Sequence, residues 1–177
     1  MNDAGAITIW TIGHSTRPAE EFLVLLDAHG IEQIADVRTV PKSARHPQYN
    51  SRELDAFLAS HGRGYRHFPA LGGLRKPRRD SVNTAWRHPS FRGYADHMQT
   101  SEFREGLAAL IDFARRPTAV MCAEAVWWRC HRQLVADALV ARNVTVRHIL
   151  GTGEAKIHKL NEFARVNEGS VSYPGLL

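Results

Sequence analysis

The sequence predicts a single α/β domain in which a mostly parallel sheet of about five strands is flanked by helices. Its 177 residues are enough for one hydrophobic core and few for two domains. Short apolar runs alternate with amphipathic patterns of helical spacing along the chain. The run TAVMCA at 118–123 is apolar along its length, as expected for a strand covered on both faces. We therefore expect residues 1–177 to form one domain.

The first three predicted elements form a β-α-β unit. A buried strand is predicted at 7–12, where ITIWTI is rich in β-branched and aromatic residues. A helix follows the next turn, with Ser15 or Thr16 as its N-cap and Gly30 at its end. The second strand is predicted at 31–39. A right-handed crossover through the helix makes the two strands parallel, which indicates an α/β fold.

The rest of the chain continues this alternation. Further helices are predicted at 51–62, 94–116, 130–143 and 151–167, and further strands at 65–71, 118–123 and 144–150. Residues 40–50 are polar and are expected to form a loop. Residues 72–93 are expected to be irregular, with a short helical piece around Trp86.

The chain is basic, with a formal net charge of +5, and this charge favours anionic partners. Six cations fall in one stretch that is broken by prolines and glycines: Arg75, Lys76, Arg78, Arg79, Arg87 and Arg92. We expect this stretch to be a basic loop, and such loops are most often simply solvated surface.

The sequence also bears on where the protein works. It has no run near the roughly 18 apolar residues of a membrane span and no secretory leader at its start. We expect a cytoplasmic protein without a membrane partner. Its two cysteines, Cys122 and Cys130, are too few for a disulfide framework. They are expected to be reduced thiols that are reactive, metal-binding or simply buried.

Polar side chains collect where the predicted strands end. Ligands of open parallel sheets bind beyond the carboxyl ends of the strands, because loops and helix N-termini converge there. The residues at these ends are His14 and Ser15 after the first strand, Asp36 and Arg38 at the end of the second, His67 in the third, and Cys122, Glu124 and Cys130 after the fourth. We expect them to meet at one edge of the sheet.

The segment MCAEAVWWRCHR at 121–132 holds both cysteines and is the main candidate for chemistry. A helix that starts near Cys130 presents unpaired N–H groups and the positive end of its dipole, which stabilise a thiolate or a bound phosphate. Such surroundings lower the pKa of a thiol from about 8.5 and make the sulfur nucleophilic at neutral pH. Cys122 could equally be the nucleophile, with Glu124 or His131 as the proton carrier.

Several of these residues also have a purely structural interpretation. Cys122 could be a small core residue at the end of an apolar strand. Glu124 could pair with a neighbouring arginine, and His14 could bond to a backbone group. Asp36 and Arg38 lie two residues apart on one strand face and could form a structural ion pair.

The absence of several established motifs argues against some classes of enzyme and cofactor. Six residues separate Cys122 from Arg129, one more than in the C-x5-R loop of cysteine phosphatases, and the glycines of that loop are absent. The C-x-x-C, P-loop, H-E-x-x-H and dinucleotide-binding G-x-G-x-x-G patterns are absent as well, so no cofactor is assigned. A metal site built from Cys122, Cys130 and either His131 or His14 stays open as an alternative, although its spacing matches no standard zinc finger.

Five ordered motifs make the chain similar to a known family. TIGHSTR, DVRTVPKSARHPQYN, HFPALGGLR, FRGYADHM and MCAEAVWWRCHR together resemble the bacterial and archaeal domain of unknown function family 488, over nearly the whole chain. The resemblance implies an α/β fold and gives no settled reaction, although some members carry DNA-repair labels. It implies that the functional positions are His14, Ser15, Asp36, Arg38, Arg75, Cys122, Glu124, Cys130, His131 and Arg132.

The leading hypothesis from the sequence is an enzyme with an anion-binding pocket that acts on a phosphate-bearing substrate, either a nucleotide or a nucleic acid. The expected catalytic residues are Cys122, Glu124, Cys130, Asp36 and His14. The expected substrate-binding residues are Ser15, Arg38, Arg75, His131 and Arg132. Neither the reaction class nor the oligomeric state is assigned.

A second hypothesis is a noncatalytic nucleic-acid-binding module with a link to repair. The basic loop at 75–92 would contact phosphates, and Trp127 or Trp128 would stack on bases. Core packing is the more common fate of tryptophan.

Overall fold

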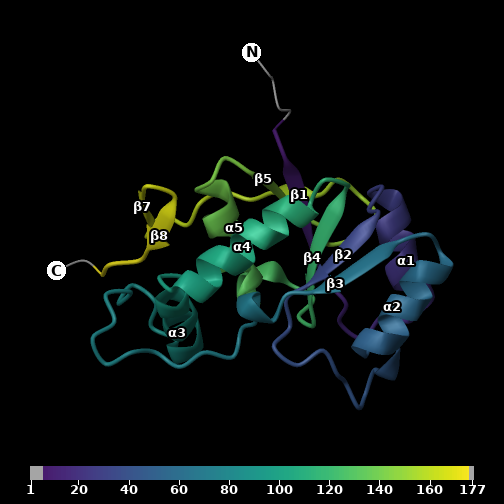
Figure 1. Ribbon diagram of the computed structural model, residues 1–177, viewed down its shortest axis with the longest axis horizontal. Coiled ribbons are helices and arrows are strands. Elements are labelled where there is room, and N and C mark those ends of the chain that lie inside the picture. The colour runs from purple at the N-terminus through teal and green to yellow at the C-terminus, as the bar shows by residue number, and fades with distance from the viewer. Residues whose placement is uncertain (1–5, 176–177) are drawn as a thin grey trace.

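A six-stranded sheet forms the centre of the structure, a computed structural model that describes residues 6–175 (Figure 1). Its strands are β1 (Thr8–Gly13), β2 (Gln33–Asp36), β3 (Gly64–His67), β4 (Thr118–Cys122), β5 (Thr145–His148) and β6 (Lys156–Ile157). The strand order is β3-β2-β4-β1-β5-β6. Strands β1 to β5 are parallel, whereas β6 pairs antiparallel with β5. The α/β class and the mostly parallel sheet are thus confirmed, with six strands in place of about five.

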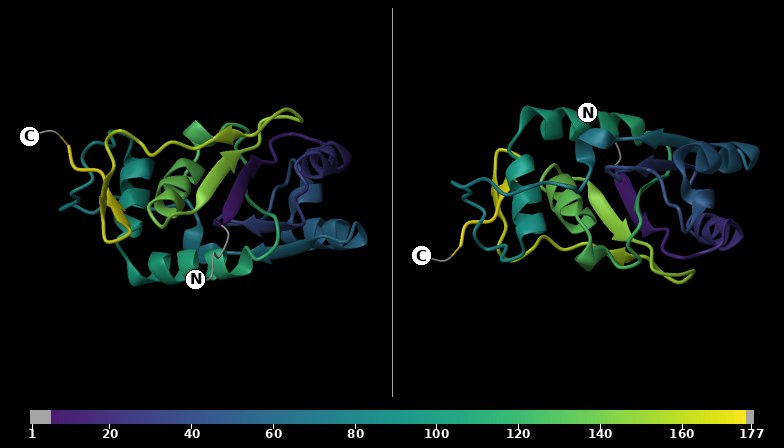
Figure 2. Two further views of the ribbon diagram at one scale, coloured as in Figure 1. Left: turned by 90° about the horizontal axis from the view of Figure 1, so that it is seen from above. Right: turned by 90° about the horizontal axis from the view of Figure 1, so that it is seen from below.

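Helices cover both faces of the sheet (Figure 2). Helices α1 (Ala19–Ala28) and α2 (Ser51–Ser60) lie on one face, and α3 (Pro89–His97), α4 (Ser101–Phe113) and α5 (Arg132–Val140) lie on the other. Alternate residues of β4 show this division, because Ala119 and Met121 pack with the first group and Val120 with the second. No helix within residues 6–175 is long and apolar enough to cross a bilayer.

Three details of the helix prediction are wrong. The helix expected at 94–116 is two helices, because the Thr100 hydroxyl caps α4 by accepting from the Phe103 N–H at 3.2 Å. The helical piece expected around Trp86 lies further along the chain, where α3 begins with Pro89 at its first turn. Helix α1 begins after Pro18 and takes no side-chain cap from Ser15 or Thr16.

The helix expected at 151–167 is also wrong. This region contains β6 and the strand β7 (Arg165–Asn167), which forms a hairpin with β8 (Ser170–Ser172). Glu168 and Gly169 both have positive φ, as a two-residue hairpin turn of type I′ requires. Strand β6 forms because β5 would otherwise leave its backbone groups unpaired at the sheet edge.

Asp137 on α5 ties this C-terminal segment to the body of the molecule. Its carboxylate is buried and accepts hydrogen bonds from His158 Nε2–H at 2.8 Å, the Tyr173 hydroxyl at 2.7 Å and the Asn161 N–H at 3.0 Å. All three donors lie beyond β5. Since buried polar groups are costly to leave unpaired, this one carboxylate fixes three separate points of the segment.

We predict that Asp137→Ala lowers the free energy of unfolding by about 3 kcal/mol or more, because it leaves several buried donors unpaired. Tyr173→Phe should cost about 1 kcal/mol, because it removes one hydrogen bond. Urea unfolding measures both values. Asp112→Ala is the control, since Asp112 is exposed and pairs only with Arg115; its effect should stay within about 0.5 kcal/mol. Equal effects of the two aspartate variants would contradict this account.

Candidate functional site

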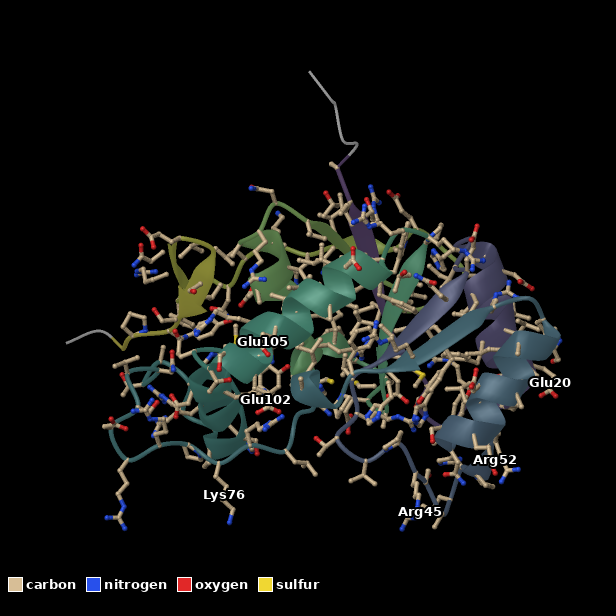
Figure 3. All side chains as sticks on the ribbon, in the orientation of Figure 1. Glu20, Arg45, Arg52, Lys76, Glu102 and Glu105 are labelled. Atoms are coloured by element: carbon tan, nitrogen blue, oxygen red, sulfur yellow. The ribbon has the colours of Figure 1, made fainter. Side chains whose placement is uncertain are left out.

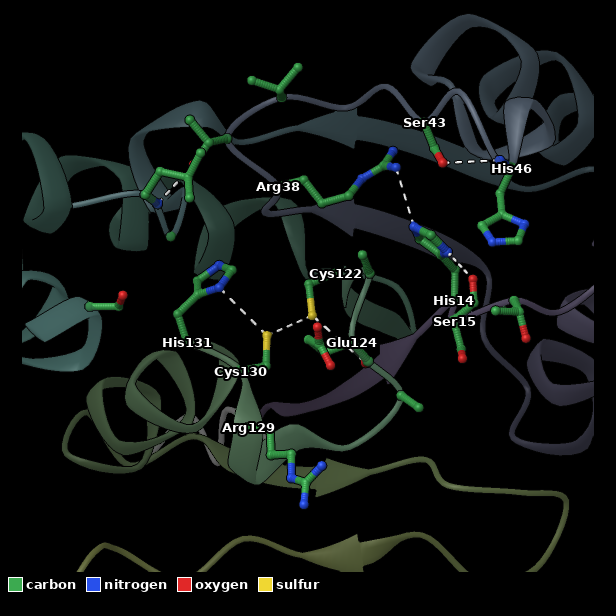
Figure 4. A pocket seen from close by; sticks show the side chains of 18 of the residues that line it. His14, Ser15, Arg38, Ser43, His46, Cys122, Glu124, Arg129, Cys130 and His131 are labelled. Carbon is green, nitrogen blue, oxygen red and sulfur yellow. Dashed lines mark hydrogen bonds between the residues drawn. The ribbon is translucent and has the colours of Figure 1, made fainter. Parts of the chain in front are cut away.

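A pocket of about 1040 Å³ lies at the carboxyl ends of β1, β2 and β4 (Figure 4). Seven of the residues expected from the sequence line it: His14, Ser15, Arg38, Cys122, Glu124, Cys130 and His131. Parallel pairing of β1 with β4 sets Gly13 opposite Cys122, so that the chain segments leaving these strands run side by side. A Cβ atom at position 13 would overlap the carbonyl oxygen of Glu124, which explains why a glycine ends β1.

The two cysteines form a close pair in this pocket. Cys122 ends β4 and Cys130 precedes α5, yet their Sγ atoms lie 2.6 Å apart (Figure 4). Both are free thiols, exposed by only 3% and 5%. Burial raises the pKa of Cys122, and the sulfur of Cys130 beside it raises that pKa further. The thiol form of Cys122 is therefore favoured, and its S–H can donate a hydrogen bond to the neighbouring sulfur.

Cys130 has the opposite tendency. The backbone N–H of Arg132, in the first turn of α5, points at its Sγ over 3.5 Å, and the Nδ1 atom of His131 lies at the same distance. Burial by itself raises the pKa of this thiol. Hydrogen bonds from Cys122 and His131, together with the charge of Arg132, outweigh burial and hold the pKa of Cys130 well below its usual value. Of the two sulfurs, Cys130 is therefore the one whose surroundings favour the thiolate form.

His131 is held in a defined orientation. Its Nε2–H donates to the carbonyl oxygen of Val37 at 3.0 Å, which leaves Nδ1 facing Cys130. The ring lies directly against Gly73, where a Cβ atom would come within 2.5 Å of Nδ1. Tyr94 packs on the ring from α3, with centroids 5.1 Å apart. In this tautomer Nδ1 can accept the thiol proton of Cys130, and the Nδ1–H formed in this way then donates a hydrogen bond to the thiolate.

Arg132 does not line the pocket. Its side chain is only 1% exposed, and its Nη2–H donates to the carbonyl oxygen of Glu124 at 2.6 Å. Nη1–H points at the hydroxyl of Thr11 over 3.4 Å, and Nε–H has no partner among the described residues. Arg132 therefore holds the segment between β4 and α5 from the protein interior, and it places a buried positive charge beside that segment.

A chain of hydrogen bonds continues from Thr11 into the interior. The Thr11 hydroxyl donates to His148 Nδ1 at 2.6 Å, and His148 Nε2–H donates to His158 Nδ1 at 2.9 Å. His158 in turn donates to Asp137. Burial lowers the pKa of His148 to about 3, and the charge of Arg132 acts in the same direction. His148 is therefore neutral at pH 7, as this chain of donors and acceptors requires.

Asp36 and Arg38 form a buried ion pair. The carboxylate of Asp36 accepts from Arg38 Nε–H at 2.9 Å, from Arg38 Nη2–H at 2.6 Å and from the Tyr65 hydroxyl at 2.6 Å. Asp36 does not line the pocket, and these bonds occupy both of its oxygens. Arg38 lines the pocket and also donates to the carbonyl oxygen of Tyr49 at 2.7 Å. Asp36 thus positions Arg38 and has no free oxygen for a substrate.

His14 is a neutral group at the floor of the pocket. Its ring stacks on Tyr49 with centroids 4.1 Å apart, and its Nδ1–H donates to the carbonyl oxygen of Ser15 at 2.8 Å. Nε2 faces Arg38 Nη1 at 3.4 Å and accepts from it. Burial lowers the pKa of His14 to about 4, more than the bond to Ser15 raises it. At neutral pH His14 therefore carries no charge for an anion.

Arg75 lies outside the pocket lining. Its Nε–H donates to the carbonyl oxygen of Gly72 at 3.2 Å, and its Nη2 lies 3.7 Å from the Glu102 carboxylate. It supports the turn that brings Gly73 against His131. In the rest of the basic loop Arg78 is paired with Asp80.

Basic side chains from two parts of the chain line the pocket rim. Lys42, Arg45 and His46 come from the loop between β2 and α2, and Arg129 comes from the opposite wall. Arg45 projects from its loop into solvent (Figure 3). The basic residues of this loop were not singled out from the sequence, although the letters KSARH at 42–46, shortly after the DVR motif, were the available signal. Among the lining residues Glu124 is the one carboxylate, so the pocket is strongly cationic.

The two tryptophans have different environments. Trp127, in the short 3₁₀ turn Trp127–Arg129, stacks on His148 with centroids 4.2 Å apart and the rings nearly parallel. Trp128 is 48% exposed and lines the pocket. Of the two, only Trp128 is placed to meet a ligand.

A metal site has no support in the described residues. Within 6–175 no three His, Cys, Asp or Glu side chains are grouped so that they could hold a metal ion. The alternative that used Cys122, Cys130 and a histidine therefore has no matching cluster.

Gly73→Ala should displace His131 from Cys130, because the new methyl group would occupy the space of the imidazole ring. We expect the pKa of the Cys130 thiol to rise, measured as the pH dependence of its alkylation. Gly153→Ala, where a Cβ atom meets open space, is the matched control and should leave the titration unchanged. The account fails if the two variants titrate alike.

Comparison with known proteins agrees with the resemblance to family 488. Residues 18–139 match the model of the family described as domain of unknown function DUF488, a stretch that runs from α1 to α5 and holds both cysteines. No curated protein and no solved structure matches the chain. Since the family model covers more than half of the chain, the protein belongs to the DUF488 family.

Proposed function

We propose that the protein is an enzyme that binds a phosphate-bearing substrate, a nucleotide or a nucleic acid, in this pocket and attacks it with the thiolate of Cys130. One observation carries the proposal: the Cys130 sulfur faces the first turn of α5, His131 Nδ1 and the Cys122 thiol at the base of a cationic pocket. A low-pKa thiolate in a substrate-sized pocket is a typical arrangement for covalent catalysis.

The residues around the sulfur have distinct roles in this proposal. His131 accepts the proton of Cys130 at Nδ1 while Val37 holds its other nitrogen. The Cys122 thiol donates a hydrogen bond that stabilises the thiolate. Glu124 lies two residues after Cys122, is exposed and lines the pocket. In this proposal its carboxylate carries protons to or from the bound substrate.

The charge of the rim supports an anionic substrate. Lys42, Arg45 and Arg129 are exposed and take part in no ion pair with the described residues. Arg38, which is tied to Asp36, adds a fixed cation deeper in the pocket. Trp128 offers an aromatic face, on which a base can stack. Phosphate and base recognition are therefore available on one surface.

The same surface favours a second candidate, a noncatalytic nucleic-acid-binding module. The exposed cations and Trp128 would suffice for binding without any thiol chemistry. In that case replacement of Cys130 would change nothing that the protein does, whereas an enzyme would lose its reaction.

The alkylation of Cys130 by iodoacetamide tests the thiolate. We expect Cys130 to be labelled with an apparent pKa well below about 8.5, and inorganic phosphate or a nucleotide to slow the labelling. Mass spectrometry locates the label. Cys130→Ser should abolish the low-pKa reaction, whereas Cys122→Ser should keep it, because a serine hydroxyl can still donate a hydrogen bond. Labelling with an ordinary thiol pKa, or no protection by either anion, would refute the proposal.

Binding of a fluorescent single-stranded oligonucleotide tests the rim. Arg45→Ala should weaken binding and make the slope of log affinity against log salt shallower by about 0.7, the value for one phosphate contact on a single strand. Trp128→Ala should cost about 1–3 kcal/mol of stacking energy. Arg79→Ala is the control, because Arg79 is exposed in the basic loop outside the pocket. Loss of affinity in the control alone would place binding on that loop.

A further inference from the structure

The pair of cysteines is built for a second chemistry, the formation of a bond between its own sulfurs. We propose that hydroperoxides oxidise Cys130 and that Cys122 then closes a reversible disulfide with it. The inference rests on the Cys130 thiolate of the proposed function, but it needs no phosphate-bearing substrate.

The geometry requires little movement for this bond. The two Sγ atoms lie 2.6 Å apart, compared with about 2.05 Å in a disulfide. Cys122 is fixed by the pairing of β4 with β1, and Cys130 is fixed at the start of α5. No third cysteine competes for either sulfur in the whole sequence. A small shift of the side chains is enough to join them.

Disulfide formation of this kind needs one thiolate that attacks the hydroperoxide and one thiol that attacks the product, and the two cysteines differ in this respect. Cys130 faces three hydrogen-bond donors, which favour the nucleophilic thiolate, whereas Cys122 keeps a proton. Both sulfurs line the pocket, so a small hydroperoxide can reach them although each is nearly buried. Cys130 is therefore the sulfur that reacts first, and Cys122 is the one that resolves the product.

The chemical steps balance with a hydroperoxide as the oxidant. The Cys130 thiolate attacks the terminal oxygen; the O–O bond breaks, an S–O bond forms, and the alkoxide that leaves takes a proton from solvent. Sulfur is oxidised to the sulfenic acid while the peroxide is reduced. The sulfur of Cys122 then attacks that of Cys130; the S–O bond breaks, hydroxide leaves, and the thiol proton of Cys122 converts it to water. A dithiol reductant reverses the disulfide by thiol exchange.

The disulfide would change the site without unfolding it. It joins the two ends of the segment 123–129, which Arg132 already holds through the carbonyl oxygen of Glu124. The rim cations and Trp128 keep their places, while the nucleophile is lost. Oxidation therefore switches off attack by Cys130 and leaves ligand binding intact.

The experiment is to treat the full chain with one equivalent of hydrogen peroxide, to block remaining thiols and to map the products by mass spectrometry. We expect an intramolecular Cys122–Cys130 disulfide, a mass lower by two hydrogens, and complete recovery of both thiols with dithiothreitol. A sulfinic acid on Cys130 without the disulfide, or disulfides only between chains, would overturn the proposal.

Two variants establish the order of the steps. Cys122→Ser should stop at the sulfenic acid of Cys130, which dimedone traps, and should then be overoxidised. Cys130→Ser should react with peroxide at least tenfold more slowly than the wild type; equal rates would overturn the assignment of the attacking sulfur. Thermal unfolding checks that each variant is folded. The disulfide mapped in the wild-type protein does not depend on either variant. Protection of Cys130 by phosphate is measured on the reduced protein. If phosphate gives no protection but the disulfide still forms, only the proposed function is refuted.

Discussion

The buried guanidinium of Arg132 is the constraint on which the rest of the site depends. It holds the carbonyl oxygen of Glu124, and no carboxylate pairs with it among residues 6–175. A buried cation without a counter-ion is costly. A thiolate at Cys130 would supply a negative charge near this cation, and the charge of Arg132 in turn lowers the pKa of that thiol. The buried charge of Arg132 therefore favours the ionised form of this cysteine.

The hydrogen-bond chain from Arg132 to Asp137 imposes a second condition. Thr11, His148 and His158 link the two charged groups, and each neutral histidine donates at one nitrogen and accepts at the other. A proton on His148 would place another positive charge near Arg132 and break the sequence of donors. Burial is the main cause of the low pKa of His148, about 3, and the charge of Arg132 lowers it further. A second positive charge beside Arg132 is therefore disfavoured. The C-terminal segment is thereby part of the support of the site.

Much of the fold was predictable from the sequence, because its central strands are short apolar runs and its first unit has a clear turn at each end. The tail was not predictable. Strand β6 exists only where β5 offers an edge, and the β7–β8 hairpin is held by the bond from Tyr173 to Asp137 on α5. Neither partner is visible in the local sequence pattern of the tail, and Asp137 lies 36 residues before Tyr173. The break between α3 and α4 depended on a single capping residue, Thr100, inside a continuous helical pattern.

The sequence also predicted that the ends of β1, β2 and β4 meet at one edge, but it wrongly added His67 of β3 to the group and did not show which groups are free there. Asp36 lies beside Arg38 in the chain, yet it is the Tyr65 hydroxyl, from another strand, that completes its set of donors. The groups that set reactivity are buried and fixed, whereas Lys42, Arg45 and Arg129 are exposed on loops. Salt screens exposed charges far more than buried ones. The proposed recognition at the rim should therefore vary with ionic strength, whereas the contacts that lower the pKa of Cys130 are buried and are screened far less.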